Sequence, residues 1–329
     1  MIRRLSCAAV LFLSAASIVV PATAQAQAAD WPSRPITIVM GFPPGAGTDV
    51  VARVLQPLLD KALNQRIVMD YKAGAGGNIA SDFVANAKPD GYTFLLGTAG
   101  THGINAALYG KLTFDVENDF TPVSTLVDVS NVLMINPKAI DAKDLKDFIA
   151  KVKAAPGKYN YASTGNGAGT HLAFAEFNAK AGLDMVHVPY KGSPDAVQSV
   201  LNGDTCCLFA QVQIAIPQAN AGKVKLLGVS TKTRVPAIPD VPTVDEAGLP
   251  GFESYTWFGI FGPKGLDPAI AQKMNLAIKT ALADPDAQKK LIELGNTPRY
   301  ETVEQFKATV KANRAKWAEV VKAVGAKIE

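Results

Sequence analysis

Apolar and polar residues follow two different periods along most of the chain. Short runs rich in β-branched and apolar residues predict strands, at residues 36–40, 66–70, 93–96, 159–162, 186–188, 205–209 and 225–229. Between these runs, apolar residues recur three and four positions apart, as in Val50, Val54 and Leu58, which predicts helices. Strands that alternate with helices are typical of an α/β fold with mainly parallel sheets.

The helices have recognisable beginnings and ends. The periodicity predicts helices that begin at Asp49, pass through 79–84, and cover 141–155, 170–181 and 195–202. The C-terminal third is expected to be mainly helical, because Asp267-Pro268 and Asp284-Pro285 each pair an N-cap with a proline at the first helical position. Thr302 and Gln305 form a capping box for a last helix that ends near residue 324.

The alternation of strand and helix occurs in two successive series, which predicts two lobes. We expect the chain to cross between the lobes near Asp128 and again near Thr231, before a proline-rich stretch. The first lobe would then hold residues 29–127 and 233–329, and the second lobe residues 128–232. Two crossings between two lobes form a hinge, so the cleft between the lobes can open and close.

The N-terminal 28 residues have the pattern of a secretory signal peptide. Arg3 and Arg4 precede an apolar stretch at residues 7–20, and small residues follow at 22–28. The apolar stretch is shorter than the ~20 residues of a membrane-spanning helix, so a retained anchor is the less favoured alternative. We expect cleavage near residues 26–28 and export to the periplasm.

Composition and charge narrow the class of protein. The chain has 329 residues, of which 48% are hydrophobic and 19% charged, which excludes intrinsic disorder. The formal charge is +4, from 33 basic and 29 acidic residues. Without Arg3 and Arg4 it falls to 31 against 29, or +2. This balance gives no electrostatic reason to expect nucleic acid or a membrane surface as a partner.

Two of the three cysteines, Cys206 and Cys207, remain after the predicted cleavage. Adjacent cysteines can form a disulfide only through a strained ring. Because the pair lies in an apolar run, we favour a buried strand with two small apolar side chains over a disulfide.

Four glycine-rich loops follow predicted strands, at residues 41–49, 97–102, 163–171 and 189–193. Ligands of open parallel sheets bind at this edge, where helix N-termini present free N–H groups and partial positive charge. Lys191 is the only basic residue in the four loops, so the pattern favours a carboxylate over a phosphate. Ordinary tight turns are the alternative reading.

Catalytic and cofactor motifs are missing from the sequence. There is no phosphate-binding Gly-Lys-Ser/Thr loop, no Gly-X-Ser-X-Gly elbow, and the three histidines lack the spacing of metal ligands. His102 and His171 begin predicted helices, where a neutral hydrogen-bonding role and a structural role are equally open, and His187 is expected to be packed. Asp49 could orient a ligand or cap its own helix. We therefore expect no enzyme, no cofactor and no metal.

The loops also carry a family resemblance that extends over nearly the whole mature chain. The matching segments are residues 31–35 (WPSRP), 42–49 (FPPGAGTD), 74–78 (GAGGN), 89–93 (PDGYT), 161–167 (YASTGNG), 188–192 (VPYKG), 239–248 (PDVPTVDEAG) and 257–259 (WFG). In this order they resemble the Bug (Bordetella uptake gene) family of solute-binding components of tripartite tricarboxylate transporters. The resemblance implies a two-lobe, Venus-flytrap periplasmic binding protein of type II, monomeric, which delivers a small organic carboxylate to a membrane permease.

The resemblance also implies a set of ligand-binding residues. Carried onto matching positions, these are Pro44, Gly45, Ala46, Gly47, Asp49, Thr98, Thr101, His102, Ser163, Thr164, Asn166 and His171. The far end of the ligand is expected to meet Phe42, Gln211 and Trp257. After residues 205–209 the family commonly has Phe-Asp, whereas this chain has Ala210-Gln211, which disfavours an amino-acid ligand. The alternatives are a ligand sensor that signals to a sensor kinase and a periplasmic hydrolase that uses Ser163 and His171.

Overall fold

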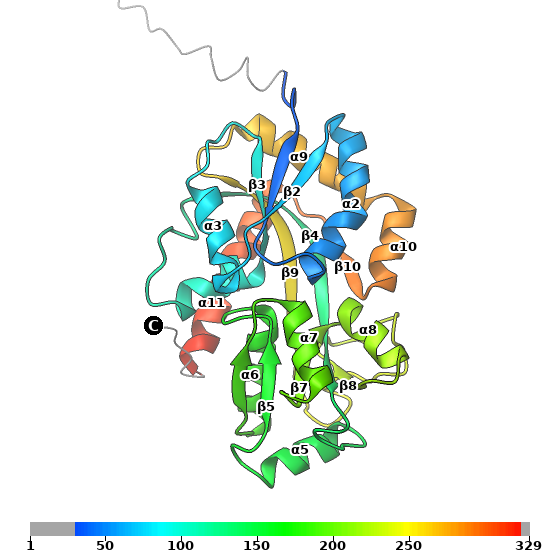
Figure 1. Ribbon diagram of the computed structural model, residues 1–329. Helices are drawn as coiled ribbons and strands as arrows, with labels where there is room; N and C mark the ends of the chain where they lie inside the picture. The colour runs from blue at the N-terminus through cyan, green and yellow to red at the C-terminus, as the bar shows by residue number, and fades with distance from the viewer. Residues whose placement is uncertain (1–29, 324–329) are drawn as a thin grey trace, which may run out of the picture.

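The computed structural model describes residues 30–323, which form two lobes stacked end to end (Figure 1). The predicted signal peptide and the last residues of the chain lie outside this range. Within it, no helix is both long enough and apolar enough to span a bilayer.

The first lobe begins with three parallel strands, β1 (Ile36–Met40), β2 (Ile67–Tyr71) and β3 (Thr93–Thr98). Each of the first two connections contains a helix, α2 (Gly47–Leu63) and α3 (Asn78–Ala85), as the sequence predicted. The helices bury one face, because α2 packs Val51, Leu55 and Leu59 into the core under the sheet. The carboxyl ends of β1 and β3 point toward the second lobe (Figure 1).

The rest of the first-lobe sheet is antiparallel. β9 (Tyr255–Pro263) pairs with β3 and with β4 (Phe120–Ile135), and β10 (Asn296–Pro298) pairs with β4. The sheets are thus mixed, not mainly parallel as expected. The sequence pattern missed β9 because almost every residue of it is buried, so no alternation of apolar and polar residues marks it as a strand.

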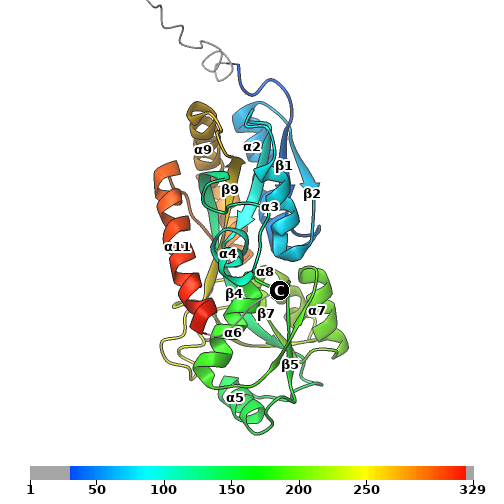
Figure 2. The same cartoon turned by 90° about the vertical axis from the view of Figure 1, so that its left-hand side faces the viewer.

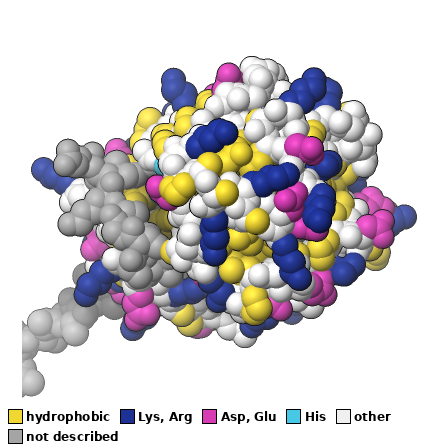
Figure 3. Space-filling view, turned by 90° about the horizontal axis from the view of Figure 1, so that it is seen from below, with side chains coloured by type: hydrophobic (Ala, Val, Ile, Leu, Met, Phe, Trp, Pro, Cys, Tyr) yellow, Lys and Arg dark blue, Asp and Glu magenta, His cyan; other side chains and the backbone are white. Residues whose placement is uncertain are grey.

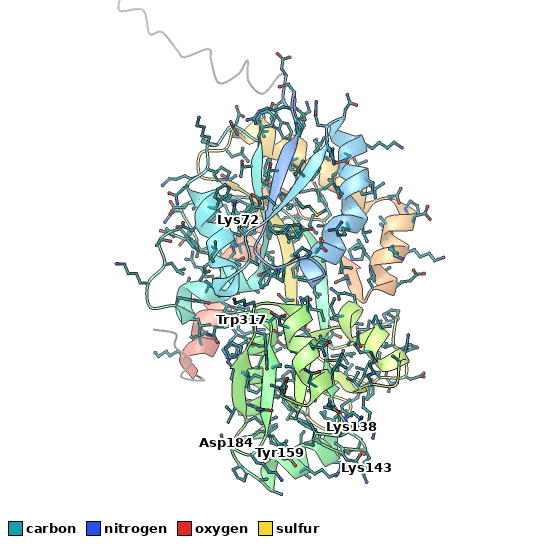
Figure 4. All side chains as sticks on the ribbon, in the orientation of Figure 1. Lys72, Lys138, Lys143, Tyr159, Asp184 and Trp317 are labelled. Atoms are coloured by element: carbon teal, nitrogen blue, oxygen red, sulfur yellow. The ribbon has the colours of Figure 1, made fainter. Side chains whose placement is uncertain are left out.

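Three helices complete the first lobe, α9 (Pro268–Leu282), α10 (Pro285–Glu293) and α11 (Val303–Ala323). The predicted caps are present, because the carboxylates of Asp267 and Asp284 accept hydrogen bonds from the N–H groups of Ala269 and Ala287. α11 runs along the side of both lobes (Figure 2). Figure 4 places its Trp317 at the level where the lobes meet.

The second lobe repeats the strand–helix alternation. Its strands are β5 (Asn160–Ser163), β6 (Val186–Pro189), β7 (Cys207–Gln211) and β8 (Lys225–Val229). Its helices are α5 (Leu145–Lys153), α6 (Gly169–Ala181), α7 (Ser193–Asn202) and α8 (Val212–Asn220). β5 pairs in parallel with β6 and β7, whereas β7 and β8 pair antiparallel with β4.

β4 carries the chain from one lobe to the other. It pairs with β9 as far as Ser130 and with β7 from Asn131 onward, close to the first predicted crossing near Asp128. The second crossing differs from the prediction near Thr231. Val244 and Phe252 pack into the core of the second lobe, so the chain returns to the first lobe only where β9 begins at Tyr255.

Candidate functional site

A small cavity lies between the lobes, where the N-termini of α2 and α6 meet. Its volume is about 20 Å³, enough for one water molecule. Its walls are formed by Phe42, Ala46, Gly47, Thr48, Thr98, Thr164, Ala168, Gly169, Thr170, Ser193, Gln211, Thr256 and Phe258. None of these lining residues is charged.

The two helices supply free N–H groups to this cavity. α2 follows the N-cap Ala46 and α6 follows the N-cap Ala168, and neither N-cap makes a side-chain capping bond. The first N–H groups of a helix have no partner within it and carry about half a positive charge. Two such ends converging on one neutral cavity favour an anionic group.

Several buried polar atoms beside the cavity have no hydrogen-bond partner. They are Thr48 Oγ1, Gln211 Oε1, Gln213 Oε1 and Nε2, and both amide atoms of Asn131. Asn131 is the β4 residue opposite Gln211 in the sheet. Leaving a buried polar group unpaired costs roughly 1–3 kcal/mol, a cost that a bound water or ligand at this position would relieve.

Gly47 allows the two glutamine amides to reach the N-terminus of α2. A Cβ at this position would lie 2.0 Å from Gln211 Oε1 and 2.7 Å from Gln213 Nε2. Gly47 belongs to the first lobe and both glutamines to the second. The cavity is therefore closed by contacts that form only when the lobes come together.

Other contacts between the lobes show that this structure is the closed form. Gly76 and Gly167 approach the opposite lobe so closely that a Cβ would lie 2.4 Å from the carbonyl oxygen of Asn166 and 2.2 Å from Asn105 Oδ1, respectively. Tyr109 donates a hydrogen bond of 3.2 Å to the same Asn166 oxygen. Gly76 and Gly167 therefore allow the two lobes to approach each other closely.

A larger cavity of about 680 Å³ lies outside the small one. Phe42 and Thr164 line both cavities, so they stand between the inner cavity and this outer one. Asn166 and Lys191 line the outer cavity together with Asp195. Figure 3 shows the molecule from below, where basic, acidic and apolar side chains are interspersed.

The predicted site residues divide into several groups. Those that line the inner cavity are Phe42, Ala46, Gly47, Thr98, Thr164 and Gln211, whereas Asn166 lines the outer one. Pro44 and Gly45 are exposed in the loop before α2. Trp257 is fully buried in the first-lobe core, away from both cavities.

Asp49 acts within its own loop and helix. Its carboxylate accepts hydrogen bonds from Gly45 N–H at 2.8 Å, the Tyr71 hydroxyl at 2.6 Å and Arg53 at 3.1 Å. Burial alone would raise the pKa of Asp49, but these hydrogen bonds and the Arg53 charge outweigh it and lower the pKa. Of the two roles predicted for Asp49, the contacts match the structural one.

Thr101 and His102 support the cavity wall from behind. The Thr101 hydroxyl bonds the backbone of Thr98, which lines the cavity, and lies 2.8 Å from His102 Nδ1. The His102 ring stacks on Phe261 with centroids 3.8 Å apart. Burial lowers the pKa of His102 to about 3, so the ring is neutral.

Ser163 and His171 make their contacts within the second lobe. The Ser163 hydroxyl lies 2.7 Å from His187 Nε2, and His171 Nδ1 accepts a bond of 3.3 Å from Gly167 N–H. The imidazole rings of His171 and His187 stack with their centroids 3.9 Å apart. Burial lowers the pKa of His171 to about 4, and burial together with His171 lowers that of His187 to about 3.

The sequence analysis named the loop that contains Thr48 but did not single out Thr170 or Gln213 as site residues. Thr48 and Thr170 occupy the same position in their helices, because α2 and α6 both begin with Gly-Thr. This repeated Gly-Thr dipeptide at a helix start is the sequence feature from which the two threonines could have been predicted to line the cavity. Nothing in the sequence marks Gln213, because its placement depends on β7 ending against α2.

Two hinged α/β lobes that enclose a small polar cavity define a periplasmic solute-binding protein. Residues 51–326 match the model of the tripartite tricarboxylate transporter family receptor, TctC. The chain belongs to this family, and so the predicted Bug-type resemblance and two-lobe fold are confirmed.

Similar proteins and solved structures agree with this assignment. The Bordetella pertussis protein BugT is 34% identical over 97% of each chain. An adipate-bound R. palustris protein is 32% identical with a TM-score of 0.88, over 91% of this chain and 100% of its own. The malate-bound MatC of Rhodopseudomonas palustris is 34% identical with a TM-score of 0.83, over 88% and 100%.

Proposed function

We propose that this protein captures a small carboxylate in the inner cavity and delivers it to the membrane permease of a tripartite transporter. The observation that carries the proposal is the convergence of two uncapped helix N-termini, one from each lobe, on a cavity lined by no charged residue. A carboxylate there gains charge-assisted hydrogen bonds worth about 1.5–3 kcal/mol each.

The far end of the ligand is proposed to be neutral or anionic. The amides of Gln211 and Gln213 offer both donors and acceptors, whereas no carboxylate lines the cavity to hold an ammonium group. Adipate and malate, the ligands of two structural relatives, both lack an ammonium group. We therefore expect malate-like or adipate-like acids to bind better than aspartate.

Binding is proposed to proceed by hinge closure. The inner cavity of about 20 Å³ holds no more than one water molecule here, so the ligand must enter an open form, and the loaded lobes must close around it less tightly than in this structure. The N-terminus of α2 and the Gln211 amide come from different lobes and reach one ligand only after closure, so the ligand shifts the population toward a closed form. The permease would then distinguish loaded from empty protein by shape.

The same proposal includes export and a monomeric state. The family acts in the periplasm, and residues 1–28 carry the pattern of a cleaved signal. No catalytic role is proposed for Ser163, because it is fully buried and lines neither cavity.

A thermal-shift series with malate, adipate and aspartate tests the proposal. Binding to the folded state raises the melting temperature, and we expect the two acids without an ammonium group to raise it more than aspartate. Titration calorimetry then gives the affinity. If no mono- or dicarboxylate in a wider panel raised the melting temperature, the proposed function would be wrong.

A further inference from the structure

The two buried cysteines lie unusually close together. Cys206 Sγ is 3.2 Å from Cys207 Sγ. Both thiols also lie near one acceptor, the carbonyl oxygen of Asn160, at 2.9 and 3.7 Å. Both cysteines are free and buried in an apolar core, as the sequence analysis expected, but it did not predict the contact between their sulfurs.

The closeness arises from a break in the strand pattern. Successive residues of a strand point to opposite faces, and in β7 Cys207 and Phe209 face one core while Leu208 and Ala210 face the other. Alternation would place Cys206 with Leu208. Instead, Cys206 lies in the same core as Cys207, just before the strand begins.

The backbone holds Cys206 in this position from both sides. Its N–H donates to Asn160 Oδ1 at 3.1 Å, and its carbonyl oxygen accepts from Asn136 N–H at 2.9 Å. These bonds come from β5 and from the end of β4, the two neighbours of β7. The fold itself therefore brings the two sulfurs together.

Cys206 and Cys207 are both free thiols, and they are the only cysteines among the described residues. A disulfide needs an S–S distance of about 2.05 Å, so the sulfurs must approach by roughly 1 Å. The Cα atoms of adjacent residues are about 3.8 Å apart, below the usual range for disulfides. The resulting eight-membered ring is strained and readily reduced, which is typical of a redox-responsive bond.

We propose that Cys206 and Cys207 form a vicinal disulfide when the protein is exposed to an oxidising compartment. The oxidant is a second disulfide, either of a protein thiol oxidase or of a small molecule. One cysteine thiolate attacks a sulfur of that disulfide, forms a mixed disulfide and releases the first thiol. The other cysteine then attacks its neighbour's sulfur and releases the second thiol. The pair loses two electrons and two protons, and the oxidant gains both.

Burial determines when this reaction is fast. Burial and the neighbouring Cys206 raise the pKa of the Cys207 thiol well above its ordinary value, and Cys207 is fully buried, whereas Cys206 is 4% exposed. In the folded chain, Cys206 is therefore the cysteine that attacks the disulfide of the oxidant first. Because reaction in the folded state is slow, we expect the bond to form mainly as the exported chain folds.

The test measures one tryptic peptide of the exported protein. The full chain is secreted into the periplasm of a bacterial host, purified without reductant, alkylated under denaturing conditions and digested with trypsin. Residues 192–223 lie between Lys191 and Lys223 and contain both cysteines without any other basic cleavage site. We expect this peptide to be lighter than the reduced peptide by two hydrogens and to take up alkyl groups only after reduction.

The Cys206→Ser variant is the matched control. Its peptide should be alkylated once without reductant, because Cys207 then has no neighbour. Two alkyl groups on the wild-type peptide before reduction would overturn the proposal. So would a glutathione adduct that persists after the reduced protein is incubated with oxidised glutathione. The result is independent of ligand binding, so it stands or falls apart from the proposed function.

Discussion

Gly47 is the residue on which closure of the cavity depends most directly. Its φ angle is not in the left-handed region, so an alanine fits the backbone and favours the helix by roughly 0.5–1 kcal/mol. The obstacle is steric, because the new Cβ would displace the amides of Gln211 and Gln213. The effect of the substitution should therefore fall on the ligand-bound form.

We expect Gly47→Ala to weaken carboxylate binding about tenfold, equal to ~1.4 kcal/mol, without lowering the melting temperature of the ligand-free protein. Calorimetry and thermal unfolding measure the two quantities. The same measurements on Gln211→Ala and on the double variant Gly47→Ala/Gln211→Ala complete a double-mutant cycle. If Gly47→Ala weakened binding equally in both backgrounds, contact with Gln211 would not be the cause.

Two threonines near the cavity have opposite roles. Thr48 Oγ1 is buried without a partner, whereas the Thr101 hydroxyl bonds Thr98 and His102. Thr48→Val should weaken ligand binding several-fold and leave the ligand-free protein as stable as before. Thr101→Val should lower the free energy of unfolding by about 1 kcal/mol. Urea unfolding and calorimetry distinguish the two, and equal stability losses would contradict this division.

Part of the site could be predicted from the sequence. Glycine-rich loops at strand ends placed Ala46, Gly47 and Thr98 correctly beside the cavity, because topology alone brings such loops to one edge. The directions of side chains could not be predicted in this way. Ser163 and His102 lie in the right loops, yet each hydrogen-bonds inside its own lobe, since packing of His187 and Phe261 decides where they point.

At the scale of elements, most strands and helices were predictable and the long antiparallel strands were not. The Asp-Pro caps correctly located the first residues of α9 and α10, Pro268 and Pro285. β9 and the full length of β4 escaped prediction because both are buried on two faces. The position of the second crossing could not be predicted for another reason. Residues 235–252 form no regular helix or strand, so no sequence pattern indicates which lobe they pack against.

α11 joins the lobes through a small apolar cluster. Trp317 is 2% exposed and packs with Ile104 and Leu108 of the first lobe and with Leu172 of α6. Trp317→Ala should lower the free energy of unfolding by about 3–5 kcal/mol, as measured by urea unfolding. Glu319→Ala, on an exposed position of the same helix, is the control and should have little effect. Equal effects of the two substitutions would show that the cluster does not stabilise the protein.

For the whole molecule, the buried His102 and His171 and the half-buried His187 predict a dependence of stability on pH. Their pKa values, about 3 for His102 and His187 and about 4 for His171, lie below the ~6.5 of an unfolded chain. Below about pH 6.5 the unfolded state binds protons that the native state does not, so stability falls with pH until about pH 4.

Each histidine should lower the free energy of unfolding by roughly 2 kcal/mol at about pH 5 relative to about pH 7.5. His102→Phe keeps an aromatic ring beside Phe261 and removes one group that binds a proton in the unfolded state but not in the native state. Urea unfolding across this pH range should therefore give a shallower slope for the variant. An unchanged slope would contradict the assignment of His102 as a neutral buried group.

Closure buries polar atoms of Thr48, Gln211 and Gln213 where no other group of the described residues bonds them. Opening exposes them to water, so we expect the ligand-free protein in solution to be more open than this structure. Small-angle X-ray scattering should give a larger radius of gyration before a binding carboxylate is added than after. Identical values in both states would show that closure does not depend on the ligand.

The two crossings lie side by side, since Ser130 in β4 pairs with Tyr255 in β9. Everything between them, residues 131–254, is one uninterrupted stretch of chain whose ends are neighbours. Such a segment can be exchanged like an inserted domain, with only two joints to repair. Chimeras that combine the first lobe of this chain with the corresponding segment of another receptor would therefore offer a direct route to altered solute preference.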